Sequence, residues 1–385
     1  MADQLLPKLP TRITLASVQS RFLIIHYLLN HSRMHEAWSL FGIVVRHAQA
    51  LGLHDRSRNV SDNHVTRQYR QRTFWVIYIH DRILSSVFGR PCALHDEDID
   101  QDECSLSNDE NITISRCDTV PSDGLCLAAA LVHYARLARI LGNILRQFYC
   151  SPNKRQTLTC LYTLATALET ALAEWLLALP GYLNFTVLPS SALTITMHRQ
   201  VSTLKLTYAY ANLLLYRPFI MHSMGSTVSS QTHVGLRQWV KHSHNKSLAA
   251  ADMIVSECQV LQTRGLFSKA FWMVNYCQFA AIGTLYTYKL LWPDAHHVWE
   301  VAEKARDQLP NGVQDDFVGQ RYIEVLNEFS RITADRHEQN NGAELSTDGD
   351  PWPQDLDPLL TDVPTMELGG LWSNLFFNPT VFSDE

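Results

Sequence analysis

The stretch RQYRQRTFWVIYIHDRILSSVFGRPCALHDEDID, residues 67–100, decides the fold class because it combines a helical pattern with a clear stop. From Phe74 onward, apolar residues recur at intervals of three and four, which is the spacing of one face of an α-helix. Gly89 and Pro91 end that pattern, because glycine accepts the left-handed conformation of a helix end and proline cannot continue a helix. The stretch predicts a long helix over residues 63–88, followed by an acidic loop that turns away from it.

The expected apolar face of this helix contains a carboxylate, Asp81. Its companions on that face are Phe74, Ile77, Tyr78, Leu84, Ser85 and Phe88. A buried carboxylate is costly unless a cation pairs with it, and we expect the partner to be Arg46, Arg72 or Arg90. A structural ion pair is favoured over catalysis, because no nucleophile or base accompanies the aspartate.

The spacing of three and four continues through most of the 385 residues, and the alternation typical of β-strands is nearly absent. Helices are expected over residues 15–30, 34–51, 63–88, 125–148, 153–178, 192–217, 238–263, 267–291, 294–308 and 315–334. Gly52 should end the second of them in the left-handed conformation, and Pro218 should stop the sixth. The pattern predicts an all-α protein with an N-terminal extension over residues 1–14 and a helical body over residues 15–335.

Composition narrows the classes of protein that fit. Hydrophobic residues make up 46% of the chain, which is enough for a large core. The net charge of -6, with 18% charged residues, does not match a protein that binds nucleic acid over its whole surface. The N-terminus lacks the pattern of a signal peptide, and no pair among the eight cysteines has the Cys-x-x-Cys spacing of zinc sites, so no metal is expected.

Residues 270–292 contain a single charge, Lys289, and are long enough to suggest a membrane span. Asn275, Gln278 and the tyrosine and threonine content argue against a span, because an amide within lipid is costly. A helix that is hydrophobic on all sides is typical of the interior of a large helical protein. We therefore expect a buried helix and no contact with a membrane.

The last fifty residues differ in composition from the rest of the chain. After Arg336 there is no Lys or Arg, whereas ten Asp and Glu occur between apolar residues. Such an acidic segment, rich in proline and glycine, is expected to be disordered in isolation. It is either a solvated extension or an acidic-hydrophobic segment that docks into a partner, as activation domains do. Its aromatic residues, Trp352, Trp372, Phe376 and Phe377, favour docking over residues 336–385.

The motifs of metal-binding loops and of enzymes are incomplete or absent in this sequence. Asp96, Asp98 and Asp100 hold the first, third and fifth positions of a calcium-binding EF-hand loop, but Gln101 stands where that loop needs glycine and Ser107 where it needs glutamate. The same acids are reminiscent of a magnesium-dependent terpene cyclase, yet they follow Gly-Arg-Pro in a loop and do not line a helix. No Gly-x-Ser-x-Gly elbow, phosphate-binding loop or dinucleotide fingerprint is found, so neither an enzyme nor a cofactor is expected.

Two blocks of the sequence resemble the fungal-specific transcription factor domain, also called the middle homology region. The first block, AWSLFGIVVRHAQALGLH at residues 37–54, matches that family at Trp38, Gly42, Arg46, Gly52, Leu53 and His54. The second block, the stretch quoted at the start, matches at Arg70, Arg72, Trp75, Asp81, Arg82, Gly89, Arg90, Pro91 and Asp98. Gln71 and Phe74 depart from the family pattern. Gly42 would permit close approach of another helix, and Arg46 is placed to meet a buried acid.

The resemblance implies a nuclear protein that regulates transcription by RNA polymerase II through an all-helical regulatory domain. It also implies a homodimer or a heterodimer with a related transcription factor, the transcription machinery as a target of the acidic tail, and a small-molecule inducer. Members of the family usually carry a six-cysteine zinc cluster that contacts DNA. The first cysteine here is Cys92, so DNA contact is expected only if an upstream segment carries that cluster. Two alternatives stay open: an interaction protein that pairs with full-length relatives, and, more remotely, a helical lyase or cyclase.

Overall fold

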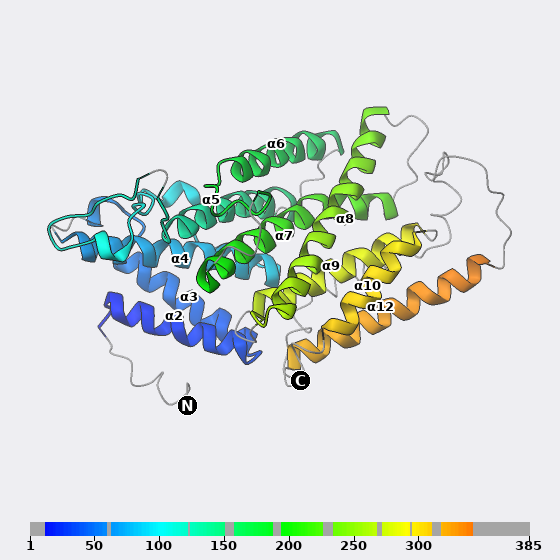
Figure 1. The fold of residues 1–385 in the computed structure, drawn as a ribbon, viewed down its shortest axis with the longest axis horizontal. Helices are drawn as coiled ribbons and strands as arrows, with labels where there is room; N and C mark the ends of the chain where they lie inside the picture. The colour runs from blue at the N-terminus through cyan, green and yellow to red at the C-terminus, as the bar shows by residue number, and fades with distance from the viewer. Residues whose placement is uncertain are drawn as a thin grey trace. The chain divides into compact units, whose positions relative to one another are not determined.

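The computed structural model describes residues 12–59, 63–121, 124–150, 158–187, 194–225, 234–267, 272–292, 295–309 and 317–341 (Figure 1). The regular structure of these residues is helical, and strand pairing is limited to isolated bridges such as that of Asp55 with Asp100. The predicted all-α class is confirmed. Most of the expected N-terminal extension and the acidic tail, with Trp352, Trp372, Phe376 and Phe377, lie outside the described residues.

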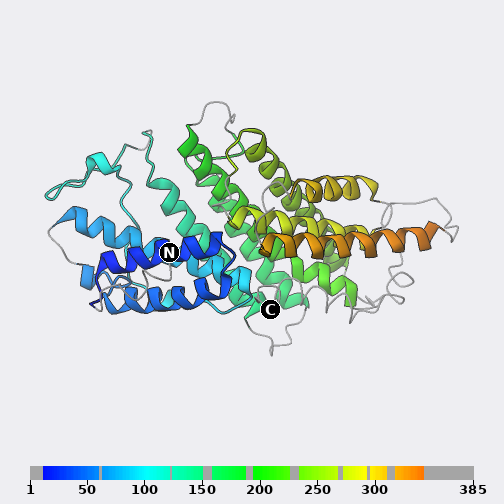
Figure 2. The same ribbon diagram turned by 90° about the horizontal axis from the view of Figure 1, so that it is seen from below.

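The chain divides into two compact units, and the first consists of residues 1–150 and 170–207. Its helices are α2 (Leu15–Asn30), α3 (Met34–Ala50), α4 (His64–Phe88) and α5 (Ala129–Ile144), and a π-helical turn, η5 (Leu145–Tyr149), continues α5. Within this unit α2 packs along α3, and α4 packs along α5 (Figure 2). The division of the chain falls within α6 (Leu158–Leu177) and α7 (Ile195–Gly225).

The second unit consists of residues 151–169 and 208–385. It contains α8 (Val234–Thr263), α9 (Trp272–Leu291), α10 (His296–Gln308) and α12 (Phe317–Asn341). α8, α10 and α12 all pack against α9, which is consequently buried along almost its whole length. The buried helix expected over this stretch is confirmed, and none of the described helices has the length and apolarity needed to cross a membrane.

Two predicted helix ends are confirmed by their backbone conformation. Gly52 follows α3 with φ of 65°, and Gly89 follows α4 with φ of 62°, so both lie in the left-handed region that favours glycine. At the end of α3, the amide of Leu53 donates to the carbonyl of Ala48 and that of Gly52 donates to Gln49, which is a Schellman motif. These ends fix where the chain leaves each helix.

The expected stop at Pro218 is wrong, because α7 passes through this proline and ends at Gly225. A proline inside a helix costs about 3 kcal/mol, through a lost hydrogen bond and a clash with the preceding turn. The two residues that follow, Phe219 and Ile220, are buried, and their packing offsets that cost. Two other helices exceed their expected ranges: α8 begins at Val234 and α12 continues to Asn341.

Candidate functional site

The apolar face predicted for α4 is buried in the structure, and Asp81 lies within it with 0% of its surface exposed. The amide of Ala93 donates to Oδ1 of Asp81 at 2.9 Å, and the amide of Leu94 donates to Oδ2 at 3.0 Å. Both amides belong to the segment that follows the Gly-Arg-Pro stop. The acidic loop therefore folds back onto α4 and does not turn away from it, which corrects the expectation drawn from the sequence.

The cation that meets Asp81 is Arg82, the next residue along the chain, and not Arg46, Arg72 or Arg90 as the sequence suggested. Nη1 of Arg82 donates to Oδ2 of Asp81 at 2.6 Å, and both side chains are almost completely buried. Consecutive residues point to different sides of a helix, so the pattern of apolar positions does not suggest such a pair. The long arginine side chain covers this separation.

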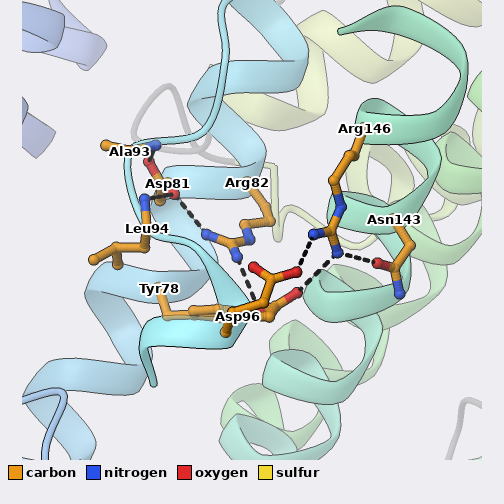
Figure 3. Close-up of polar contacts among 9 residues, drawn as sticks. Tyr78, Asp81, Arg82, Ala93, Leu94, Asp96, Asn143 and Arg146 are labelled. Atoms are coloured by element: carbon orange, nitrogen blue, oxygen red, sulfur yellow. Dashed lines mark hydrogen bonds and ion pairs between the residues drawn. The ribbon is translucent and has the colours of Figure 1, made fainter. Parts of the chain in front are cut away.

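The same arginine links α4 to the acidic loop (Figure 3). Nη2 of Arg82 donates to Oδ1 of Asp96 at 3.0 Å, and the hydroxyl of Tyr78 donates to the same oxygen at 2.6 Å. The guanidinium carbon of Arg82 also lies 3.9 Å from the centre of the Tyr78 ring, in a cation–π contact. From the turn that continues α5, Nη2 of Arg146 lies 3.7 Å from the other oxygen of Asp96. We call Tyr78, Asp81, Arg82, Asp96 and Arg146 the Asp–Arg cluster.

Burial perturbs the ionisation of this cluster. Desolvation raises the pKa of Asp81, while Arg82 and the amides of Ala93 and Leu94 act in the opposite direction. Desolvation also lowers the pKa of Arg82. The electrostatic effects of Tyr78, Asp81, Cys92 and Asp96 outweigh this and raise the pKa of the guanidinium above its ordinary value. Burial raises the pKa of Cys92, beside the cluster, to about 11. Cys92 therefore stays a thiol at neutral pH and supplies no nucleophilic thiolate.

A glycine on α5 makes room for the cluster. A Cβ atom at Gly142 would lie 3.0 Å from Nε of Arg82 and 3.2 Å from its Cγ, which is closer than carbon atoms normally approach. The absence of a side chain at Gly142 lets the stem of Arg82 run between α4 and α5. Nothing in the sequence patterns pointed to Gly142, Asp96 or Arg146 as parts of this arrangement.

Two arginines in the first half of α4 form hydrogen bonds with chain segments that precede and follow this helix in the sequence. Nη2 of Arg70 donates to the carbonyl of Leu51 at 2.8 Å, at the end of α3. Nη2 of Arg72 donates to the carbonyl of Ser107 at 2.9 Å, and Nη1 contacts the carboxylate of Asp109. Both arginines thus donate hydrogen bonds to carbonyl groups of irregular chain, which have no partner within a helix.

Three further residues of the family pattern fix the loop to this helix and to α3. Nε1 of Trp75 donates to the carbonyl of Asp102 at 2.8 Å. The amide of Asp100 donates to the carbonyl of His54 at 3.0 Å, and Leu53 is completely buried beside it. The loop after α4 and the end of α3 are consequently joined by both side-chain and main-chain hydrogen bonds.

Trp38, Arg90 and Phe88 join α3 to the last turn of α4. The rings of Trp38 and Phe88 meet edge to face with their centres 5.5 Å apart, and the guanidinium of Arg90 lies 5.0 Å from the centre of the Trp38 ring. Next to them, the carbonyl of Pro91 accepts a hydrogen bond of 3.3 Å from the hydroxyl of Ser85. This contact secures the exit of the chain from the helix.

Two expectations about residues of α3 are wrong, and Asp98 of the acidic loop lies at the surface. Gly42 is exposed, and a Cβ atom placed there would meet nothing within 4 Å, so this glycine serves no close helix contact among the residues that the structure describes. Arg46 is exposed and donates to Oε1 of Gln49, away from any buried acid. Asp98 is exposed in the acidic loop.

The Asp–Arg cluster has the geometry of a structural ion pair. Asp81 is inaccessible to solvent, and Asp96 already accepts from Tyr78 and Arg82. Within the described ranges, no group of three or more His, Cys, Asp or Glu side chains is arranged to hold a metal ion. The chemistry of the cluster is to hold the acidic loop and α5 against α4 by balanced charges, two acids against two arginines.

Comparison with known proteins identifies related sequences. The chain is 30% identical over 189 residues to the transcriptional activator protein acu-15 of Neurospora crassa, covering 48% of this chain and 20% of that protein. It is 24% identical over 326 residues to activator of stress genes 1 of Saccharomyces cerevisiae, covering 82% of this chain and 33% of that protein. A third relative, transcription factor FBD3 of Gibberella moniliformis, is 38% identical over 112 residues, which are 27% of this chain and 15% of that protein.

The chain spans about a third or less of the length of these curated relatives. No solved structure matches it with significance. The family model of the fungal specific transcription factor domain matches residues 4–176, a range that includes α2 to α5 and the whole Asp–Arg cluster. Residues 4–176 therefore belong to the family of the fungal specific transcription factor domain.

Proposed function

We propose that this chain is the regulatory part of a fungal transcription regulator that acts in the nucleus on transcription by RNA polymerase II, and that it is not an enzyme. The observation that carries the proposal is the family match over residues 4–176, together with the names of the relatives, which are activators and a transcription factor. The family pattern supports a structural role for its residues, since Asp81, Arg82 and Trp75 are all buried in contacts within the chain.

The acidic tail is the segment that we propose contacts the transcription machinery. Its residues 337–385 carry ten acidic side chains and no Lys or Arg, and Trp352, Trp372, Phe376 and Phe377 are spaced among them. Acidic side chains favour contact with water, while aromatic side chains supply the apolar area that a partner groove buries. In the same proposal, a related transcription factor is the dimer partner that supplies DNA contact, and a small-molecule inducer shifts the helical body between states.

The test is to fuse residues 1–385 to an unrelated DNA-binding domain in a fungal host that carries a reporter gene with the matching binding sites. We expect the fusion to change reporter expression severalfold relative to the DNA-binding domain alone. An unchanged reporter, with the fusion protein present in the nucleus, would contradict the proposed function.

The role of the tail is tested in the same assay. Replacing Trp352, Trp372, Phe376 and Phe377 by alanine should remove most of the effect of the fusion on the reporter. The matched control replaces four polar residues of the same tail, Ser346, Thr347, Thr361 and Thr365, by alanine, and should leave the reporter unchanged. If the aromatic variant and the control behave alike, the tail does not act through its aromatic residues.

A further inference from the structure

Two histidines of the first unit meet between helices: His26 of α2 and His80 of α4. The centres of their rings lie 4.9 Å apart, and the ring planes are inclined at 82°. The ring of Phe22 lies 4.9 Å from that of His26 and 4.7 Å from that of His80, so it forms an apolar wall beside the pair. Both histidines are partly exposed. The pair is thus sheltered by an apolar ring and still in contact with solvent.

The hydrogen bonds of the two rings leave nitrogen lone pairs available. Nδ1 of His80 lies 2.8 Å from the carbonyl oxygen of Val76. Because a carbonyl oxygen only accepts, Nδ1 carries the proton and Nε2 of the neutral ring keeps its lone pair. Among the residues that the structure describes, no hydrogen bond reaches Nε2 of His80 or either ring nitrogen of His26. A bond from an imidazole to a backbone carbonyl is the contact that commonly orients a metal-binding histidine.

Burial keeps both rings neutral. Desolvation lowers the pKa of His26. Desolvation and the neighbouring His26 lower the pKa of His80 to about 3, against the effect of its hydrogen bond to Val76. The sequence of α2, LASVQSRFLIIHYLLN, contains no Asp or Glu that would pair with a protonated ring. At neutral pH a metal ion therefore meets two imidazoles from which no proton has to be displaced.

We propose that His26 and His80 together bind a zinc ion, which links α2 to α4. Imidazole nitrogen is a preferred ligand of Zn²⁺. Two imidazoles that bind one tetrahedral zinc ion at about 2.0 Å have their ring centres about 5 Å apart, which matches the separation of 4.9 Å. Val76 orients the ring of His80, and the torsion that turns the ring of His26 is broad, so a nitrogen of His26 can face the same ion.

The coordination of this ion is completed by water. Within the described ranges, no group of three or more His, Cys, Asp or Glu side chains is arranged to hold a metal ion. Two protein ligands make a weaker site than the three or four of most zinc proteins, so we expect a dissociation constant in the micromolar range or above. The site is separate from the six-cysteine cluster usual in the family, because its ligands are histidines of the helical body.

Isothermal titration calorimetry of the full chain with Zn²⁺ tests the proposal. The exposed thiols of Cys150 and Cys160 are alkylated first, because thiols also bind zinc. We expect His26→Gln and His80→Gln each to weaken zinc binding at one site about tenfold or more. An ion that joins two helices binds the folded chain only. Zinc at about 1 mM should therefore raise the melting temperature of the wild type by about 3 °C or more, and that of either variant by less than half as much.

The matched control is His31→Gln, which changes an exposed histidine just after α2 that contacts Tyr27, and it should bind zinc as the wild type does. Melting without zinc, followed by circular dichroism, shows whether each variant is folded. A wild-type chain that binds no zinc at about 1 mM overturns the proposal. Binding that both variants leave unchanged, or that only one of them weakens, overturns it too, because the ion would not bridge the two helices. None of these measurements depends on the proposed role in transcription.

Discussion

Removal of the buried Asp81 side chain should clearly lower the stability of the first unit. Asp81→Ala leaves the amides of Ala93 and Leu94 without their acceptor and removes one of the two carboxylates that neutralise Arg82. We expect the free energy of unfolding to fall by about 3 kcal/mol, measured by urea unfolding at neutral pH. Asp98→Ala, in the same loop but exposed, should change it by less than about 0.5 kcal/mol. Equal effects of the two variants would argue against the ion pair as the stabilising contact.

His133 on α5 gives the first unit a dependence on pH. It is buried, and desolvation, assisted by Arg136, lowers its pKa to about 4 from the ordinary value of 6.5, against the attraction of Glu103. Between these two values the unfolded chain binds a proton that the folded chain does not. The stability that the folded state gains by keeping His133 neutral is therefore fully present above about pH 6.5. It is lost as the pH falls toward about 4.

Urea unfolding at a series of pH values between these limits measures this effect. His133→Gln should show a smaller loss of stability between about pH 6.5 and pH 4 than the wild type, because the titrating group is absent. Identical slopes for the two proteins would show that other groups dominate acid unfolding.

At the scale of elements, two glycines in helices should respond oppositely to the same substitution. Gly142→Ala brings a Cβ atom to 3.0 Å from Nε of Arg82 and should lower the free energy of unfolding by about 1–2 kcal/mol. Gly42→Ala adds a methyl group to open space on an exposed helix and should raise it by about 0.5–1 kcal/mol. Thermal unfolding of both variants checks the signs. A stabilised Gly142→Ala would show that Arg82 has room to move.

The sequence predicted elements whose ends depend on local chemistry. The extent of α4 follows from its periodicity and from Gly89, and all seven residues predicted for its apolar face are buried. Others outside that face, such as Trp75, Ile79 and Ile83, are buried as well. The end of α7 was not predictable in this way, because a proline stops a helix only if nothing else stabilises the following turn. Burial of Phe219 and Ile220 is a tertiary effect that no local pattern contains.

The partners within the Asp–Arg cluster show a second limit of the sequence. The carboxylate of Asp81 on an apolar face indicates that a cation must pair with it. The three arginines that the sequence suggested did not include the adjacent Arg82, which is the partner in the structure. The contribution of Arg146 depends on α5 packing against α4, which a single sequence does not specify. The resemblance to a family supplied the fold class, whereas the contacts needed the structure.

At the scale of the whole molecule, the first unit is discontinuous along the chain. Residues 170–207 return to it, where Nε1 of Trp175 donates to the carbonyl of His133 at 2.8 Å and the hydroxyl of Thr207 donates to that of Tyr134 at 3.3 Å. A fragment of residues 1–150 lacks these contacts and the burial of Leu172, Leu179 and Leu183.

We expect a fragment of residues 1–207 to unfold cooperatively on heating, followed by circular dichroism. A fragment of residues 1–150 should be aggregated or should melt without a cooperative transition, because about 1.5–3 kcal/mol is lost for each large apolar side chain removed. A cooperative transition in the shorter fragment at the same temperature would show that the returning segment is dispensable.

The acidic loop that folds back onto α4 also has a bearing on the order in which the chain folds. The partners of Asp81 and Arg82 in the acidic loop lie only 12 to 14 residues further along the chain, and Asp96 is 18 residues from Tyr78. Contacts between residues so near in sequence close short loops, which costs little chain entropy and takes place rapidly. The helix and its loop can thus assemble before the distant segments arrive, and Asp81→Ala should slow refolding more than it accelerates unfolding.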